Sequence, residues 1–316
     1  MSPHLPRGPL APKATEDRAL FGIGLVLLAY AMFSMVDASA KWLAVYGYPA
    51  MQLAFMRYVA HFFISGARIV SNGWSWRYFY TKHPLLVVVR GLLILAATVF
   101  NFIALKYIPL TLTSTILFSA PIIVCLLSGT VLGERVGPWR WLAIVLGFAG
   151  VLVAIRPFDE SFHWAALLSL AGATSFSFYI LLTRRLSGIV ASDTMQFYAG
   201  LVGCTLLFPF ALVFWQEPES LAQWMLLIGL GVFAWIGHEF LTRAFGYADA
   251  SLLTPYTYSF MIYLTIWSVI LFDHFPDHWT MTGAAIIVSS GLLIWTRERK
   301  TRQPGLFTKA DPIANK

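Results

Sequence analysis

The stretch LLVVVRGLLILAATVFNFIAL, residues 85–105, contains a single charged side chain, Arg90. About 20 apolar residues in helical conformation span the hydrocarbon core of a bilayer, so this stretch is typical of a transmembrane helix. The whole chain has the same character, because 58% of its 316 residues are hydrophobic, 12% are charged and the mean hydropathy is +0.70. A soluble domain carries roughly 25% charged residues. The composition therefore predicts an integral membrane protein and excludes a water-soluble globule.

Other apolar runs of similar length are bounded by charged residues, proline or glycine. Such boundaries end one helix and begin the next. The predicted fold class is therefore an all-α integral membrane protein with ten transmembrane helices. The predicted helices are residues 20–43, 50–70, 85–105, 110–132, 139–155, 163–183, 195–215, 221–245, 251–271 and 279–296.

Lysine and arginine are distributed unevenly between the segments that join these helices. With the N-terminus on the cytoplasmic side, the cytoplasmic segments hold 17 of these residues, and the opposite side holds Lys41, Lys106 and Arg156. Because basic residues accumulate in cytoplasmic loops, the pattern predicts that both termini face the cytoplasm. The net charge of +7 is explained by this arrangement, which argues against nucleic acid as a partner. The opposite side is acidic and carries Asp159, Glu160, Glu217, Glu219, Asp273 and Asp277.

The two halves of the chain contain similar segments at a nearly constant separation. Residues 104–110 match 244–250 at an offset of 140, residues 49–53 match 193–197 at 144, and residues 150–152 match 291–293 at 141. Chance similarity between apolar sequences is the alternative explanation. A repeated unit of five helices crosses the membrane in opposite senses in its two copies, because five is odd. Inverted repeats of this kind are typical of secondary transporters that work by alternating access.

Several short motifs support a family resemblance. They are Asp37-Ala38-Ser39-Ala40-Lys41, Gln52 with Arg57, the run 104–110, and Leu132-Gly133-Glu134-Arg135 followed by Trp141 and residues 147–151. With these motifs the chain resembles the drug/metabolite transporter superfamily, and within it the proteins built from two EamA repeats, over about residues 20–297. Where the second repeat of such proteins commonly has Gly-Glu, this chain has Asp273-His274, so no function is assigned to those two positions.

The resemblance implies a division of the chain into four parts. A disordered cytoplasmic tail covers residues 1–18, and a cytoplasmic C-terminal tail covers residues 298–316. Between them, residues 19–157 form the first EamA repeat with helices 1–5, and residues 158–297 form the second with helices 6–10.

Ionisable residues inside the predicted helices are functional candidates, because a charge in the hydrocarbon core is costly unless it is paired or hydrated. Asp37 and Arg57 lie at similar depth below the outer ends of helices 1 and 2. They are expected either to form a structural salt bridge or to bind solute or a proton. Arg90 and Glu239 lie at matching depth in helices 3 and 8, which are equivalent in the two repeats. These four charges are candidates for a central pathway.

A proton-coupling role is most plausible for Glu239 beside His238, since a carboxyl group in a poorly solvated cavity can exchange a proton near neutral pH. The alternative is that Arg243, one helical turn further on, neutralises Glu239. His61 lies one turn beyond Arg57 on the same helix face and is either a cavity residue or a hydrogen-bonding partner between helices. Asn101 and Gln196 have the same two interpretations, with helix–helix contact favoured.

Aromatic residues within the predicted helices suit a flat, partly polar solute. Tyr179, Tyr256 and Tyr258 are therefore substrate-binding candidates, although lipid-facing rings are common in such helices. Pro121 and Pro255 remove backbone hydrogen bonds and are expected to loosen helices 4 and 9, as broken helices do at transport sites.

These patterns favour a secondary transporter of a small organic metabolite in the cytoplasmic (inner) membrane, with protons as a candidate coupling ion. The aromatic content favours a heteroaromatic solute such as a flavin, and export of amino acids or related metabolites is the alternative. A channel and a membrane-embedded enzyme are the rival classes. No Gly-rich loop ending in Gly-Lys-Ser/Thr occurs, which argues against ATP hydrolysis. No cofactor or metal is expected. The expected partners are membrane lipid and the solute, and the protein is expected to be a monomer or a homodimer.

Overall fold

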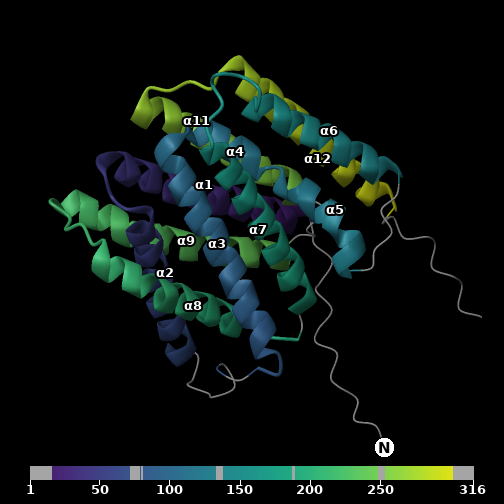
Figure 1. Ribbon diagram of the computed structural model, residues 1–316. Coiled ribbons are helices and arrows are strands. Elements are labelled where there is room, and N and C mark those ends of the chain that lie inside the picture. Colours follow the sequence, from purple (N-terminus) through teal and green to yellow (C-terminus); the bar gives the residue numbers. More distant parts are fainter. Residues whose placement is uncertain are drawn as a thin grey trace, which may run out of the picture.

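The computed structural model describes residues 16–71, 79, 81–132, 138–186, 189–247 and 253–301, and every regular element in these ranges is helical (Figure 1). The predicted tails, the Gly133-Glu134-Arg135 motif and residues 248–250 of the repeat comparison lie largely or wholly outside the described residues. The first half contains α1 (Glu16–Tyr46), α2 (Ala50–Ser71), α3 (Pro84–Tyr107), α4 (Leu110–Leu117), α5 (Ala120–Leu132) and α6 (Pro138–Ile155). The second half contains α7 (Ala165–Leu186), α8 (Ser192–Val213), α9 (Leu221–Tyr247), η2 (Thr254–Tyr258), α11 (Ser259–Phe272) and α12 (His278–Thr301).

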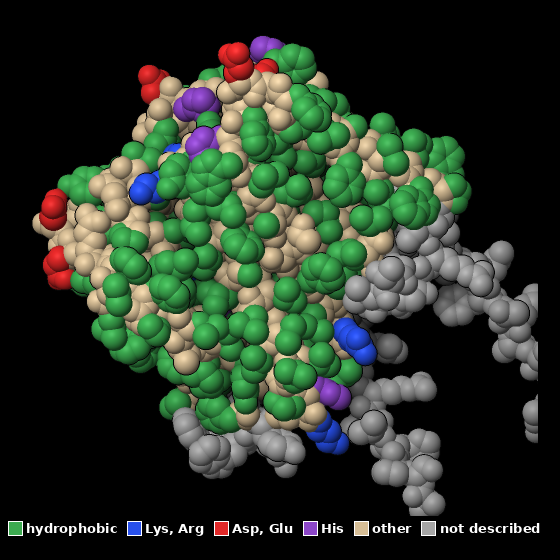
Figure 2. Space-filling model, in the orientation of Figure 1, with side chains coloured by type: hydrophobic (Ala, Val, Ile, Leu, Met, Phe, Trp, Pro, Cys, Tyr) green, Lys and Arg blue, Asp and Glu red, His purple; other side chains and the backbone are tan. Residues whose placement is uncertain are grey.

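The described helices make this an integral, multi-pass membrane protein. Eight segments in the described ranges are long and apolar enough to cross a membrane, and the segment Leu110–Leu127 runs through α4 into α5. Two further apolar helices, Trp141–Ile155 and Tyr256–Phe272, are shorter. Large apolar side chains also cover the outside of the bundle, as Figure 2 shows across the middle of the molecule. A surface of this kind is suited to lipid rather than to water.

Two helices are interrupted near the prolines at which the sequence predicts a loosened backbone. The first interruption separates α4 from α5 at Phe118 and Ser119, just before Pro121. Ser177 of α7 donates a hydrogen bond to the carbonyl oxygen of Ala120 at 3.1 Å, which ties this break to the neighbouring helix. The second interruption is η2, a 3₁₀ segment that begins with Thr254-Pro255 and leads into α11. The predicted breaks are therefore present in both halves.

Helices of the first half pack mainly against helices of the second half. The pairs are α1 with α9, α3 with α7, α2 with α8 and α6 with α12. The last pair is antiparallel, because Ser290 donates to the carbonyl oxygen of Ala143 at 2.7 Å, whereas Arg156 and Asp277 meet at 2.6 Å at the other end. The core is thus formed between the two halves, with Leu53, Phe102 and Leu230 in its largest apolar cluster.

Loops at one end of the bundle carry acidic residues and contact one another. Tyr46, the last residue of α1, donates to Glu219 before α9 at 2.8 Å, and Lys41 of α1 donates to the carbonyl oxygen of Ile108 at 3.0 Å. We call this the acidic end, and it carries Asp159, Glu160, Glu217, Glu219, Asp273 and Asp277. In Figure 2 the visible acidic side chains lie along the upper-left edge of the molecule. The opposite end, which includes Arg68, Arg185 and Arg243, is the basic end.

Candidate functional site

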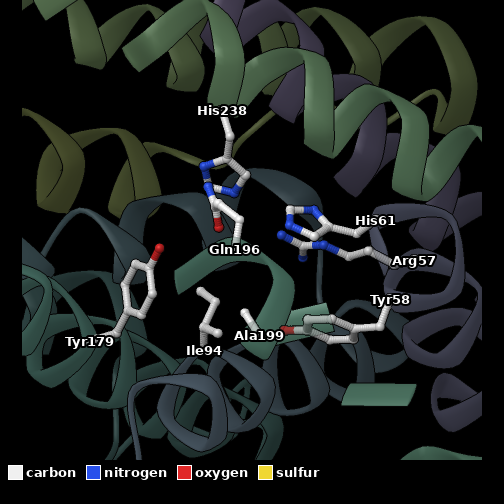
Figure 3. A pocket seen from close by; sticks show the side chains of 8 residues that line it. All are labelled: Arg57, Tyr58, His61, Ile94, Tyr179, Gln196, Ala199 and His238. Atoms are coloured by element: carbon white, nitrogen blue, oxygen red, sulfur yellow. The ribbon is translucent and has the colours of Figure 1, made fainter. Parts of the chain in front are cut away.

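A small cavity lies inside the bundle between helices of both halves. It is lined by side chains of α2, α3, α7, α8 and α9, and Figure 3 shows them converging on one space. The lining residues are Arg57, Tyr58, His61, Ile94, Tyr179, Gln196, Ala199 and His238. Four of the residues selected from the sequence as candidates, Arg57, His61, Tyr179 and His238, are brought together here.

Arg57 projects into the cavity from α2, one helical turn before His61, so both side chains lie on the same helix face. Its Nη1 donates to Thr98 Oγ1 at 3.2 Å, and its guanidinium carbon lies 5.9 Å from the centre of the Phe102 ring. Thr98 also bonds the Tyr58 hydroxyl at 3.0 Å. A guanidinium carries five N–H donors, so most of them stay available to a ligand.

Asp37 does not form the expected salt bridge with Arg57. Its Oδ1 accepts a hydrogen bond from Asn101 Nδ2 at 3.2 Å, and the carboxylate is buried between α1 and α3. Arg57 instead uses Thr98 of α3 as its partner. Equal depth in neighbouring helices did not bring the two charges together, because the direction in which each side chain leaves its helix also decides its contacts. Asn101 therefore acts as a contact between helices, as the sequence favoured.

Two histidines from opposite halves face each other across the cavity. The rings of His61 on α2 and His238 on α9 lie 6.2 Å apart and nearly perpendicular, at 87°. His61 is 7% exposed, and its Nε2 has no hydrogen-bond partner among the described residues. His238 also contacts the Phe33 ring at 4.9 Å. An unpaired buried nitrogen is costly in an apolar interior, so the position of His61 favours a role in binding.

Arg90 is buried beside the cavity and is held by neutral groups from the second half. Its Nε donates to Thr183 Oγ1 at 2.7 Å, its Nη1 to the carbonyl oxygen of Met195 at 2.9 Å, and its Nη2 to the Tyr179 hydroxyl at 2.8 Å. The guanidinium also lies over the Tyr179 ring, 4.5 Å from its centre. Arg90 thereby orients Tyr179 at the cavity wall. Glu239, which the sequence places at matching depth, is not among these partners of Arg90.

Glu239 lies at the basic end and is paired with arginines. Arg68 of α2 forms an ion pair with its Oε2, and Arg243 donates to its Oε1 at 2.8 Å, as the alternative reading of the sequence proposed. Arg68 also lies 3.5 Å from Asp193 of α8. Neither Arg68 nor Asp193 was predicted as a site residue, because each lies at a helix end where charges are ordinary. The signal that could have found them is their position at matching ends of the antiparallel pair α2 and α8.

Two tyrosine candidates lie away from the cavity. Tyr256 of η2 is 36% exposed, and Tyr258 packs on Phe118 with ring centres 5.1 Å apart. Tyr58 and Gln196 line the cavity instead, although the sequence assigned no binding role to Tyr58 and favoured helix contact for Gln196. Periodicity cannot distinguish these tyrosines, since any aromatic residue in an apolar helix fits lipid, core or cavity equally well.

A cofactor or metal has no obvious set of ligands in this region. Among the residues that the structure describes, no group of three or more His, Cys, Asp and Glu side chains could hold a metal ion. The cavity instead combines arginine, imidazole, amide and phenol groups. Such an arrangement suits reversible binding of a small organic molecule.

A bundle of membrane-crossing helices around a small polar cavity defines a membrane transporter rather than a simple anchor. Comparison with known proteins gives the family. The EamA-like transporter family matches residues 20–156 and again residues 163–296, and the chain belongs to this family.

Named relatives agree with this assignment, and one solved structure shares the fold. A protein named S-adenosylmethionine uptake transporter from Rickettsia conorii is 28% identical over 281 residues, covering 89% of this chain and 94% of the relative. A riboflavin transporter from Rhizobium johnstonii is 27% identical over 297 residues, covering 91% and 95%. A crystal structure aligns with 92% of this chain and 100% of its own, with a TM-score of 0.61 at 19% identity, and it shares the fold.

Proposed function

We propose that this protein is a secondary transporter that moves a small organic metabolite across the cytoplasmic membrane by alternating access. The observation that carries the proposal is the cavity itself, since its walls come from α2 and α3 of one half and from α7, α8 and α9 of the other. A site between two halves becomes accessible from alternate sides when one half rocks against the other.

The helix contacts support two repeats related by a two-fold axis. Suppose that α1, α2 and α3 are equivalent to α7, α8 and α9. A two-fold rotation that exchanges the two halves then turns the contact between α1 and α9 into a contact between α7 and α3, and both contacts are present. The same rotation turns the contact between α2 and α9 into one between α8 and α3. It turns the contact between α1 and α11 into the contacts of α7 with α4 and α5, and all of these contacts are present. The pairs α2–α8 and α6–α12 map onto themselves and are antiparallel. An axis in the membrane plane produces this pattern, which supports inverted repeats.

The same correspondence supports ten membrane crossings. The two shorter apolar helices, Trp141–Ile155 and Tyr256–Phe272, lie in the first and second half. The first belongs to α6, whose 18 residues reach about 27 Å at 1.5 Å per residue, close to the thickness of the hydrocarbon core. It packs along α12, which is itself a candidate span. Ten crossings place both termini on one side, which the basic residues indicate to be the cytoplasmic side.

Polar contacts between the halves close the cavity toward each end. At the acidic end, Gln52 of α2 donates to the carbonyl oxygen of Gln216 at 2.8 Å, and Tyr48 donates to Gln223 of α9 at 2.9 Å. At the basic end, Arg68 joins α2 to Glu239 of α9. Alternating access requires contacts of this kind to form and break in turn, and we assign them to the two gates.

The favoured solute is planar and heteroaromatic, because Tyr58 and Tyr179 offer aromatic surface beside hydrogen-bonding groups. The riboflavin transporter among the relatives supports this choice. Export of amino acids or related metabolites stays the alternative. Protons as the coupling ion stay a prediction.

Counterflow exchange in proteoliposomes tests the function. Purified protein is reconstituted, the vesicles are loaded with an unlabelled metabolite, and uptake of the same labelled metabolite is measured across a panel of flavins, purines and amino acids. We expect saturable exchange for one chemical group of the panel.

Arg57→Lys keeps the charge but loses the planar fork of guanidinium donors, so exchange should fall about tenfold or more. Lys106→Arg, an exposed substitution at the end of α3, is the matched control and should exchange normally. Flux that never saturates would indicate a channel instead.

A further inference from the structure

The interior around the cavity holds more fixed positive than negative charge. Arg57 and Arg90 are permanent cations there, and among the described residues Asp37 is the carboxylate that faces the same region. Glu239 follows His238 in the sequence, but its carboxylate is already paired with Arg68 and Arg243 at the basic end. The histidines that line the cavity are neutral or cationic and never negative. The site therefore has an unbalanced positive charge.

Neutral acceptors satisfy Arg90 but leave its charge without a counterion among the described residues. Its guanidinium donates hydrogen bonds to Thr183, Met195 and Tyr179, all of them uncharged groups. Arg57 donates to the neutral hydroxyl of Thr98. A cation removed from water is costly unless an anion lies close by. Asp37 offsets at most one of the two charges, so an anion entering the cavity gains strong attraction.

A second polar group next to Arg57 lacks a partner. The Nε2 atom of His61 is buried, has no hydrogen bond among the described residues, and lies one turn further along α2. Figure 3 shows the His61 ring and the Arg57 guanidinium side by side at one wall of the cavity. In the tautomer that carries its proton on Nε2, His61 is a donor beside Arg57, and two neighbouring donors fit the two oxygens of one carboxylate, since a carboxylate accepts from several N–H groups at once.

We propose that this cavity binds its solute through a carboxylate group that accepts hydrogen bonds from Arg57 and from Nε2 of His61. The remainder of the solute lies against Tyr58 and Tyr179. This inference rests on the proposed function for its site and adds the charge of the solute. It predicts discrimination against a neutral or cationic molecule of the same shape, because such a molecule leaves the arginine charge uncompensated.

Matched ligands of different charge test the inference on purified full-length protein. The probes are the aromatic carboxylates nicotinate, benzoate and orotate, each compared with its neutral amide, and the cation 1-methylnicotinamide. Ligands that bind the native state raise its melting temperature. We expect at least one carboxylate to raise it by about 3 °C or more at millimolar concentration, whereas its amide and the cation do not. No shift with any of the three carboxylates, or an equal shift with an amide, overturns the proposal.

Variants assign the effect to the two donors. Arg57→Gln should abolish the carboxylate shift and His61→Leu should weaken carboxylate binding about tenfold, while Lys106→Gln removes one exposed cation and should leave the shift unchanged. Size-exclusion profiles and the melting temperature without ligand establish that each variant is folded. If Arg57→Gln does not fold, Arg57→Lys replaces it. A carboxylate shift that persists in folded variants of both residues overturns the proposal.

Counterflow with the same probes separates this inference from the proposed function. Exchange of labelled carboxylate supports both. Binding of a carboxylate without exchange supports the carboxylate site and overturns transport of that probe. Exchange of the amide in preference to the carboxylate leaves transport intact and overturns the charge assignment.

Discussion

Single side chains at the basic end connect the two halves, and Glu239 is one of them. Its carboxylate is partly buried and binds both Arg68 of α2 and Arg243 of its own helix. A residue selected from the sequence as a proton carrier thus has an evident role as an inter-helix contact. A role of Glu239 in proton coupling and a role in holding the helices together predict different effects of the same substitution.

Glu239→Gln should lower the stability of the protein by about 1 kcal/mol, because Arg68 then keeps only its longer contact with Asp193. Arg243→Gln removes the more exposed pair, between residues one turn apart, and should cost about 0.3–0.5 kcal/mol. Thermal melting in detergent measures both. Equal effects of the two variants would contradict the inter-helix role. Unchanged melting together with lost uphill accumulation would instead identify Glu239 as a proton carrier.

At the scale of helix pairs, α6 and α12 pack closely at the backbone. A Cβ atom added to Gly283 would lie 2.6 Å from the carbonyl oxygen of Gly150 and 2.7 Å from Cβ of Ala154. Small residues at such positions allow membrane helices to approach closely. This contact holds together the two helices that end the two halves.

Gly283→Ala should therefore destabilise the protein by about 1–3 kcal/mol, because the two helices must move apart to accommodate one methyl group. Gly66→Ala on α2 is the control, since nothing lies within 4 Å of the added Cβ there. We expect that variant to melt at or above the temperature of the unsubstituted protein. Equal losses in both variants would show that close packing of α6 on α12 is not the cause.

An ion pair joins α6 and α12 at the acidic end and should depend on pH. Arg156, just after α6, and Asp277, just before α12, lie outside the membrane-spanning segments and meet at 2.6 Å. Burial tends to raise the pKa of Asp277, but the hydroxyl and backbone N–H of Thr280 and the charge of Arg156 outweigh it and lower the pKa below its ordinary value. The stabilisation is therefore complete above the ordinary aspartate pKa of about 3.9 and disappears as the pH falls through the lowered pKa.

Arg156→Gln should accordingly lower the melting temperature at pH 6–7, and this loss should shrink as the pH falls below the ordinary aspartate pKa of about 3.9 and Asp277 becomes protonated. Melting curves of both proteins across this range measure the difference. The exposed variant Lys106→Gln, recorded in parallel, should show little difference at any pH. A difference that stays constant at every pH down to acid unfolding would contradict a pairing with ionised Asp277.

The orientation of the protein in the membrane is a property of the whole molecule. The charge distribution predicts that the acidic end faces the outside of the cell and the basic end the cytoplasm. In a protein whose Cys125 and Cys204 are replaced by alanine, a cysteine at Asp159 or Glu217 should react with an impermeant maleimide on intact cells. A cysteine at Arg185, which is exposed at the end of α7, should react after the cells are opened. Labelling of Arg185→Cys on intact cells would reverse the proposed topology.

Much of the fold can be predicted from the sequence because hydropathy is a local property. Apolar runs set the helix positions, so α2 (Ala50–Ser71) lies within a residue of the predicted 50–70. Pro121 and Pro255 identify the two interrupted helices, since proline removes a backbone hydrogen bond wherever it occurs. The family motifs also depend on short segments. The largest shifts in helix boundaries occur at ends such as those of α1 and α12, which extend beyond their apolar runs.

The partners of the buried polar groups were decided by tertiary structure. Arg68 meets Glu239 across 171 residues of sequence, and Arg90 meets Tyr179 across 89. Such pairings depend on the rotation of each helix about its axis and on its vertical offset from its neighbours, and neither quantity is encoded in hydropathy. For this reason the sequence identified Arg57, His61, Tyr179 and His238 as candidates. It could not show that these side chains share one cavity, that Asp37 pairs with Asn101, or that Glu239 pairs with Arg68 at the basic end.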